Sequence, residues 1–169
     1  MIDIEIPADA PAEFRLAVES LRASSVREEL VLEQIDAPGK LAKYEVAFSA
    51  NVDAAATDVA SDLGTGRFVL LWDPEEPEPW QSRFRVITFA KSPLETDIGA
   101  DEQISDVAWA WLTEALHNRQ ANFIAEAGTA TRIISSGYGA LSNQSDHAEL
   151  EIRSSWSPVD TNAAAHLEA

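Results

Sequence analysis

Two apolar segments on either side of a proline-rich acidic loop constrain the fold of this chain more than any other feature. The segments are residues 67–72 (RFVLLW) and 83–90 (RFRVITFA), and the loop after the first, residues 73–79 (DPEEPEP), holds three prolines. Short runs rich in β-branched and aromatic residues are typical of strands, whereas closely spaced prolines exclude regular structure. The modest length of the connection favours a hairpin, so we predict that the two segments pair antiparallel in a sheet.

A second hairpin is predicted near the C-terminal end of the sequence. Residues 129–136 (TATRIISS) form its first strand, and the glycine-flanked Tyr138 with the polar run 142–146 forms the connection. In the second strand two sets of residues alternate: Ala148, Leu150, Ile152, Ser154 and Trp156 against Glu149, Glu151, Arg153 and Ser155. A period of two indicates an antiparallel strand with one buried and one solvated face. We predict that residues 129–136 pair with residues 147–156.

Three segments are predicted to be helical. The longest is residues 101–127, where apolar residues recur at helical spacing, strong helix formers dominate and Gly128 provides a C-cap. A second helix is predicted over residues 40–52 from the spacing of Leu41, Tyr44, Phe48 and Val52. The third begins behind Asp9 and Pro11, which are typical of a helix start, and carries on one side Phe14, Ala17, Val18 and Leu21.

The order of these elements predicts the fold class. With a further short strand over residues 29–35 and a loop over residues 51–66, the chain reads helix, strand, helix, strand, strand, helix, strand, strand. Paired strands with segregated helices indicate an α+β protein. We predict a single domain over residues 1–169, built as a two-layer sandwich with about five mostly antiparallel strands and helices on one face. Its middle portion has the βαββαβ order of a ferredoxin-like core.

The predicted long helix carries two tryptophans that point to different sides. Trp109 is in line with Leu112, Leu116, Phe123 and Ala127, so we predict that it is buried against the sheet. Trp111 falls on the other side, in the company of Ile104 and Val107. An indole can bury about 200 Å² of surface, so exposure of Trp111 to water is costly. Either another part of the chain or a partner covers it, and both alternatives stay open.

Charge and composition exclude several classes of function. Twelve basic and twenty-nine acidic residues give a formal net charge of −17, so we expect neither a nucleic acid nor an anionic membrane as partner. The absence of Cys excludes disulfides and thiolate metal sites. The N-terminal residues lack the basic and apolar regions of a signal peptide, and no apolar run has the length of a membrane span. We therefore expect a cytoplasmic protein.

No catalytic motif is present in the sequence. The three histidines, His117, His147 and His166, are far apart and lie in polar surroundings, which does not favour a metal site. The acidic loop of residues 73–79 is interpreted as a solvated hairpin tip. We therefore assign no catalytic residue, expect no metal or cofactor, and do not expect an enzyme.

Two arginines and a tryptophan are the candidate binding residues for an anionic ligand. Arg85 shares a strand face with Arg83, and Arg153 shares the outer face of the last strand with Glu151. Cross-strand ion pairs are the commoner use of such residues. The alternative is an arginine pocket that binds an anion, lined by Arg85, Arg153 and Trp80.

Several segments in a fixed order resemble the actinobacterial domain of unknown function 3000 family. They are residues 14–22 (FRLAVESLR), 66–74 (GRFVLLWDP), 84–89 (FRVITF), the tryptophan helix, Gly128-Thr129 and residues 151–156 (EIRSSW). The resemblance implies a bacterial cytosolic protein of uncharacterised activity and provides no catalytic residues. Lys43 and Ala108 depart from the family pattern, which has proline and glycine there. The family also implies a further apolar helix after His166 and Leu167, so we expect a truncated C-terminal helix.

Two classes of function follow from these observations. The first is a non-enzymatic protein-interaction or regulatory module that binds a protein partner or a second copy through the surface around Trp111, Ile104 and Val107. The alternative is a small-molecule-binding protein or an enzyme that acts on an anionic ligand. Its pocket is expected between the sheet and the helices.

Overall fold

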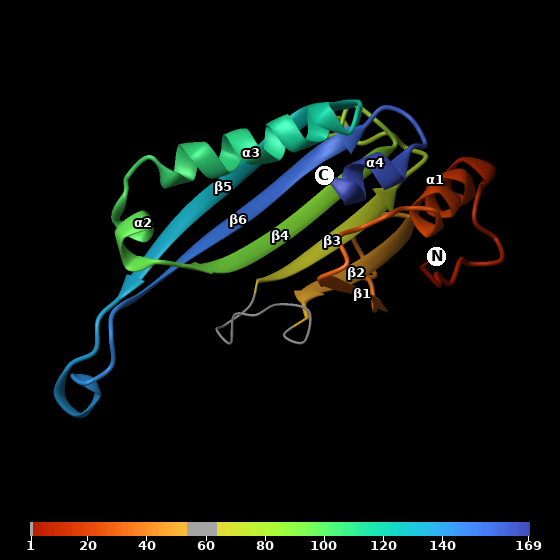
Figure 1. Cartoon of the computed structure of the whole chain (residues 1–169). Helices are drawn as coiled ribbons and strands as arrows, with labels where there is room; N and C mark the ends of the chain where they lie inside the picture. The colour runs from red at the N-terminus through yellow and green to blue at the C-terminus, as the bar shows by residue number, and fades with distance from the viewer. Residues whose placement is uncertain (1, 54–63) are drawn as a thin grey trace.

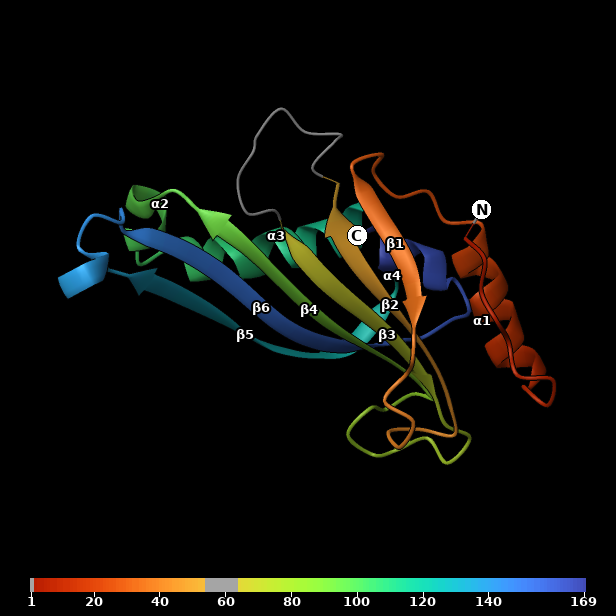
Figure 2. The same ribbon diagram turned by 90° about the horizontal axis from the view of Figure 1, so that it is seen from below.

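The computed structural model describes residues 2–53 and 64–169, which form an antiparallel sheet with helices on one of its faces (Figures 1 and 2). The strands are β1 (Leu30–Ile35), β2 (Tyr44–Val52), β3 (Thr65–Trp72), β4 (Phe84–Leu94), β5 (Phe123–Ser135) and β6 (His147–Pro158). The α-helices are α1 (Ala12–Arg22), α2 (Thr96–Ala100), α3 (Ile104–Asn118) and α4 (Ala163–Glu168), and a short 3₁₀ turn, η2, covers Gly139–Leu141.

The six strands lie in the order β1-β2-β3-β4-β6-β5, and every neighbouring pair is antiparallel. Both predicted hairpins are confirmed, because Trp72 pairs with Phe84 and Ser135 pairs with His147. The mixed fold with helices on one face is also confirmed, with six strands instead of about five. A ferredoxin-like order does not occur, because residues 36–43 connect β1 to its neighbour β2 without a helix.

Residues 40–52 are not the helix that we predicted from their spacing. They include strand β2, which pairs with β1 on one side and β3 on the other. Tyr44, Val46 and Phe48 occur at every second position and belong to the same apolar cluster, while Ala47 belongs to a cluster on the opposite side. The apolar positions fit the period of a helix as well as that of a strand. Pairing with β1 and β3 stabilises the strand.

Helix α3 ends at Asn118, well before the predicted residue 127. The amide of Gln120 donates to the carbonyl of His117 at 2.9 Å, and the amide of Ala121 donates to the carbonyl of Leu116 at 2.9 Å. These two bonds form a Schellman motif, which places a left-handed residue just past the helix. Here that residue is Gln120, with φ of 56°, where glycine is usual. The chain then turns and enters β5.

Gly128 is a strand residue beneath α3 and not the C-cap of a helix. A Cβ at this position would lie 2.5 Å from the ring of Trp109 and 2.7 Å from the carbonyl oxygen of Arg153. The indole therefore rests directly on the backbone of β5. Trp109 thus lies against the sheet as predicted, but it is half-buried and not buried. The predicted helical stripe through Phe123 and Ala127 is wrong, because those two residues belong to β5.

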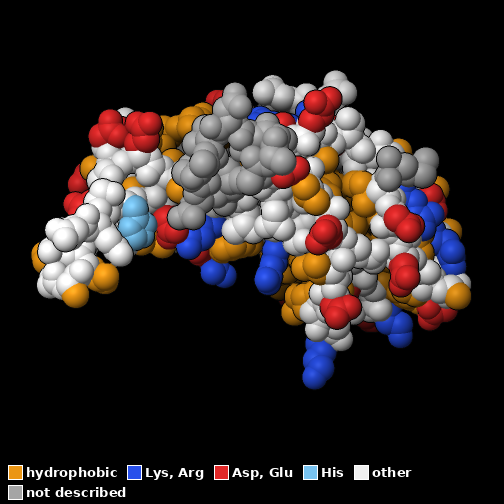
Figure 3. Space-filling model, turned by 60° about the horizontal axis from the view of Figure 1, so that its bottom comes forward, with side chains coloured by type: hydrophobic (Ala, Val, Ile, Leu, Met, Phe, Trp, Pro, Cys, Tyr) orange, Lys and Arg blue, Asp and Glu red, His pale blue; other side chains and the backbone are white. Residues whose placement is uncertain are grey.

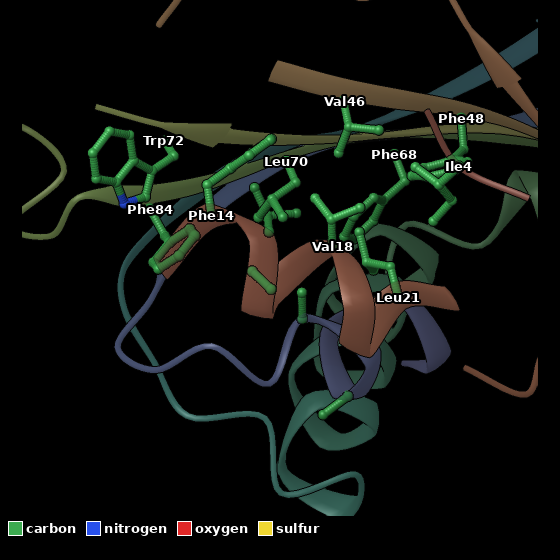
Figure 4. Packing of buried hydrophobic residues seen from close by; sticks show 14 of the residues in the cluster. Ile4, Phe14, Val18, Leu21, Val46, Phe48, Phe68, Leu70, Trp72 and Phe84 are labelled. Carbon is green, nitrogen blue, oxygen red and sulfur yellow. The ribbon is translucent and has the colours of Figure 1, made fainter. Parts of the chain in front are cut away.

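The main core lies between the sheet and the helices (Figure 4). Helix α1 points Phe14, Val18 and Leu21 towards the apolar side chains of β2 and β3, and all three are almost completely buried. Full burial of such a side chain contributes about 1.5–3 kcal/mol. Helices α3 and α4 add further apolar residues to the same cluster, including Leu116 and Ala163. These contacts fix which face of the sheet the helices cover.

The other face of the sheet, here called the open face, has no helix on it within the described residues (Figure 2). Its apolar cluster is smaller and consists of Ala47, Val69 and Leu71, with Trp80 and Ile87 packed against them. Part of this cover comes from the loops of residues 36–43 and 73–83, which contribute Ala37, Ala42 and Trp80. An uncovered sheet face with apolar side chains is a place to look for a binding site.

His166 of α4 is buried in the main core as a neutral ring. Its Nδ1 accepts a hydrogen bond from Nε1 of Trp156 at 2.9 Å, and its Nε2 has no partner. Burial lowers the pKa of His166 to about 4, although the nearby carboxylate of Asp160 acts in the opposite direction. Because the unfolded chain takes up this proton at an ordinary pKa near 6.5, protonation favours the unfolded state between these two values.

We expect His166 to make the protein less stable as the pH falls from 6.5 towards 4. The stability that the neutral His166 provides is fully present above pH 6.5. A pKa shift of this size lowers the free energy of unfolding by about 3 kcal/mol at pH 4. Urea unfolding of the wild type and of His166→Phe at several pH values measures it. The stability difference between the two proteins should change across this window. A pH-independent difference would show that the ring is not buried in its neutral form.

Candidate functional site

A groove on the open face is the candidate functional site. It has a volume of about 880 Å³, and its lining includes Leu71, Trp80, Arg85, Phe89 and Arg153. We call it the open-face groove. In Figure 3, which brings the underside of the molecule forward, several Lys and Arg side chains project along the lower border, with Asp and Glu side chains among them on the right. Basic side chains on this side stand out in a chain with a net charge of −17.

The side chains of the groove floor come from alternate positions of one strand and from its neighbour. Arg85, Ile87 and Phe89 are at every second position of β4, and they line the groove together with Leu71 of β3, the sheet partner of Arg85. Trp80 comes from the loop after β3. A turn holds it there, because the amide of Trp80 donates to the carbonyl of Pro77 at 2.8 Å. The acidic loop thus has exposed carboxylates, as predicted, but also carries an indole back onto the sheet.

Arg85 is the unusual residue of the groove, because its side chain is buried with neutral partners alone. Its Nη1 donates to the carbonyl of Ala125 at 2.8 Å and to the Oγ of Ser157 at 3.0 Å, and its Nη2 donates to the Oγ of Ser155 at 2.6 Å. The residue is only 9% exposed. No carboxylate in residues 2–53 or 64–169 forms an ion pair with it.

A β-bulge in the edge strand provides one of these partners. The pairing of β5 with β6 runs from Ile124–Ser157 to Ala127–Ser155, which leaves one extra residue on β5. Ala125, inside the bulge, has φ of 54°, a left-handed conformation that costs about 1–2 kcal/mol for a residue with a Cβ. The same bulge carries the carbonyl that accepts from Arg85. Backbone strain of this kind often marks a functional site.

The electrostatics of Arg85 favour an anion in the groove. Burial lowers the pKa of Arg85 from its ordinary value, yet a guanidinium keeps its proton in proteins. Buried charges are normally paired, because an isolated one loses its hydration. The Nε–H and the second Nη2–H take part in no hydrogen bond within the described part of the chain. These remaining donors can bind the oxygens of an anion.

Arg153 is at the rim of the groove and differs from Arg85. Its Nε donates to Glu151 at 2.6 Å, and its guanidinium lies over the ring of Phe89, 5.0 Å from the centroid. The side chain of Arg153 is 67% exposed, so this ion pair contributes little. The pairing runs along one strand and not across two. Ion pairing therefore accounts for Arg153 but not for Arg85.

The structure brings together Trp80, Arg85 and Arg153, as the arginine-pocket alternative requires, but on the other side of the sheet from the predicted one. For these three residues the expected location between sheet and helices is wrong, because the groove that they line is on the opposite face of the sheet. Ser155 and Ser157 were not predicted as partners of Arg85, although their spacing of two places them on the same face of β6 as Arg153. The bulge at Ala125 has no signal in the sequence.

The three residues of the predicted interaction surface do not form one patch. Trp111 is 61% exposed on α3, but Ile104 is buried at the start of that helix and Val107 is half-buried. Helix α3 covers the face of the sheet opposite to the groove (Figure 2). The exposed indole is therefore separate from the groove.

Comparison with known proteins identifies the family. A family model described as "Protein of unknown function (DUF3000)" matches residues 10–169, which is nearly the whole chain. The chain belongs to this family, as its motifs indicated. Neither a curated protein nor a solved structure matches it. Within the described residues, no helix is long and apolar enough to cross a membrane.

The strain at Ala125 predicts different effects of glycine at two nearby positions of β5. Ala125→Gly relieves the left-handed strain, which offsets the entropy cost of glycine, so stability should stay equal or rise by about 1 kcal/mol. Ala127→Gly, where φ is negative, should lower stability by about 0.5–1 kcal/mol. Urea unfolding of both variants provides the comparison. Equal losses at the two positions would contradict a bulge centred on Ala125.

Proposed function

We propose that this member of the DUF3000 family binds a small molecule with an anionic group and a flat apolar body in the open-face groove, without transforming it. The observation that carries the proposal is the buried guanidinium of Arg85, which has three neutral acceptors and no carboxylate partner among the described residues. In a chain with twenty-nine acidic residues, a buried cation that has no ion pair within residues 2–53 and 64–169 is a specific arrangement.

The geometry of Arg85 supports a carboxylate or phosphate as the anionic group. Its hydrogen bonds to Ala125, Ser155 and Ser157 hold the guanidinium in place before a ligand arrives. A planar, fixed donor pair binds two oxygens of one anion at little entropic cost. The surrounding apolar residues lower the local dielectric, which strengthens the attraction.

The walls of the groove support an apolar body for the ligand. Leu71, Ile87 and Phe89 form a floor, and the indole of Trp80 stands beside them. A volume of about 880 Å³ lies within the ordinary range for small-molecule sites. A ring system packed on this floor would cover the same apolar side chains that the loops leave uncovered.

The composition of the groove supports binding without catalysis. Ser155 is a hydroxyl residue of the lining, and its Oγ accepts a hydrogen bond from Arg85. The positive charge of Arg85 would oppose the positive charge that a histidine base acquires when it takes a proton from the serine. A serine nucleophile needs an adjacent general base. None of the three histidines lines the groove.

A protein-interaction role through Trp111 has weaker support. Binding hot spots are clusters of apolar and aromatic side chains. Trp111 is exposed, but the neighbours expected to complete its patch are buried or half-buried.

The proposal predicts that the protein binds an aromatic anion but not its neutral counterpart. The probes are 2-naphthoate, 2-naphthyl phosphate and the neutral 2-naphthamide, followed by chemical-shift changes in the intact protein. At least one anion should bind, and shifts should centre on β4 and Trp80. Arg85→Met should weaken binding by about tenfold to a hundredfold, since a charged hydrogen bond is lost.

Two control variants separate binding from folding. Arg85→Lys keeps the charge but loses the planar donor pair, so it should bind with intermediate affinity. Arg27→Met removes an exposed arginine that does not line the groove and should bind as the wild type does. Equal affinity for the amide and the anions, equal binding by Arg85→Met, or no binding of any probe would contradict the proposal.

A further inference from the structure

The hairpin of β5 and β6 extends beyond the body of the protein as an arm (Figures 1 and 2). We define the arm as residues 133–147, which include η2 at the tip. Residues 133–145 (IISSGYGALSNQS) contain no charged side chain, and no other uncharged run in the chain is as long. The protein has a net charge of −17, and solubility does not explain why this exposed arm lacks charged side chains.

The tip of the arm is folded and not merely extended. The amide of Leu141 donates to the carbonyl of Tyr138 at 3.0 Å, and the amide of Gln144 donates to the carbonyl of Leu141 at 3.0 Å. Gly139 has φ of 59°, and a Cβ on Gly137 would lie 2.2 Å from the carbonyl oxygen of Leu141. The tip therefore depends on glycines at two positions and holds its side chains in a fixed arrangement.

Large apolar side chains are presented to solvent along this arm. Tyr138 is 82% exposed, Leu141 is 54% exposed and Ile134 is 50% exposed. Single exposed apolar residues are normal on a protein surface, but several on one projecting and ordered element mark an interaction site. A fixed tip also lowers the ordering cost of binding.

Acidic side chains lie beside the base of the arm. Helix α2 packs there, and the hydroxyl of Thr96 donates to the carbonyl of Asp146 at 3.3 Å. The exposed acidic residues of this region, here called the acidic collar, are Glu95, Asp97, Asp101, Glu102 and Asp146. Figure 3 shows red side chains beside the white and orange arm. Arg132 also lies there, where it donates to the carbonyls of Gly99 and Ala100.

We propose that the arm inserts into an apolar cleft of another protein whose rim is basic. The apolar tip supplies the centre of such an interface, and the acidic collar supplies a charged border that a basic rim complements. The same collar disfavours a second copy of this chain, because tip-to-tip docking would bring two acidic collars together. It also disfavours nucleic acid and anionic membranes. This site is independent of the open-face groove.

The test is photo-crosslinking in the cells that make the protein, with p-benzoylphenylalanine in place of Tyr138 in the full chain. The matched control carries the same group in place of Leu16, which is 60% exposed on α1. The crosslinked protein is identified, purified and its affinity for the wild type measured. We expect a partner with a basic surface that crosslinks at position 138 and not at position 16, with affinity falling as salt rises.

Variants of the arm then separate its apolar tip from its shape. The double variant Tyr138→Ser, Leu141→Ser should weaken binding about tenfold or more, with an unchanged melting temperature because both side chains are exposed. Gly137→Ala should weaken it as well, although it removes no contact group. Leu16→Ser and Trp111→Ser should bind like the wild type.

Four outcomes would overturn the proposal. They are no crosslink at position 138 above the control, a crosslink to a second copy of the chain, an acidic partner whose affinity does not depend on salt, and wild-type affinity in the two arm variants. Loss of binding in Trp111→Ser alone would assign the interaction to α3 instead.

Discussion

The buried guanidinium of Arg85 requires hydrogen-bond acceptors and access to water or a ligand, and several features of the sheet meet these two requirements. Arg85 needs acceptors, and β6 supplies two hydroxyls at alternate positions, Ser155 and Ser157, while β5 supplies a carbonyl by bulging at Ala125. It also needs its remaining donors to reach water or a ligand, which a helix packed on the same face would prevent. The bulge, the serine spacing and the uncovered face of the sheet are therefore parts of a single arrangement.

The two faces of the sheet divide structural and functional roles. The face beneath α1, α3 and α4 holds the large side chains that stabilise the fold, and the neutral His166 of α4 packs against it. The open face has a smaller apolar cluster and the arginines. The β5–β6 hairpin connects the two proposed sites, because one part of it lines the groove and its other end forms the arm. A small molecule and a protein partner can thus bind to the same pair of strands without competing.

The sequence predicted the hairpins well because alternation and proline-rich loops are local signals. It failed for residues 40–52, where the same apolar positions fit a helix and a strand, and pairing with distant segments decides. It also failed at Gln120, since a left-handed residue other than glycine ends α3. The residue types around Arg85 indicated an anion site, but which face of the sheet they share depends on where the helices pack. A bulge such as that at Ala125 arises from three-dimensional contacts and has no pattern to read.

The most direct test of the account observes the Arg85 side chain itself. Its Nε–H resonance in a ¹⁵N spectrum, assigned by its loss in Arg85→Lys, reports contact with an anion, because this N–H has no hydrogen-bond partner among the described residues. On addition of 2-naphthoate the resonance should shift and exchange of the proton with water should slow, while the resonance of the exposed Arg27 stays unchanged. An unchanged exchange rate at Arg85, or a shift confined to Arg153, would contradict the central role of a buried and uncompensated Arg85.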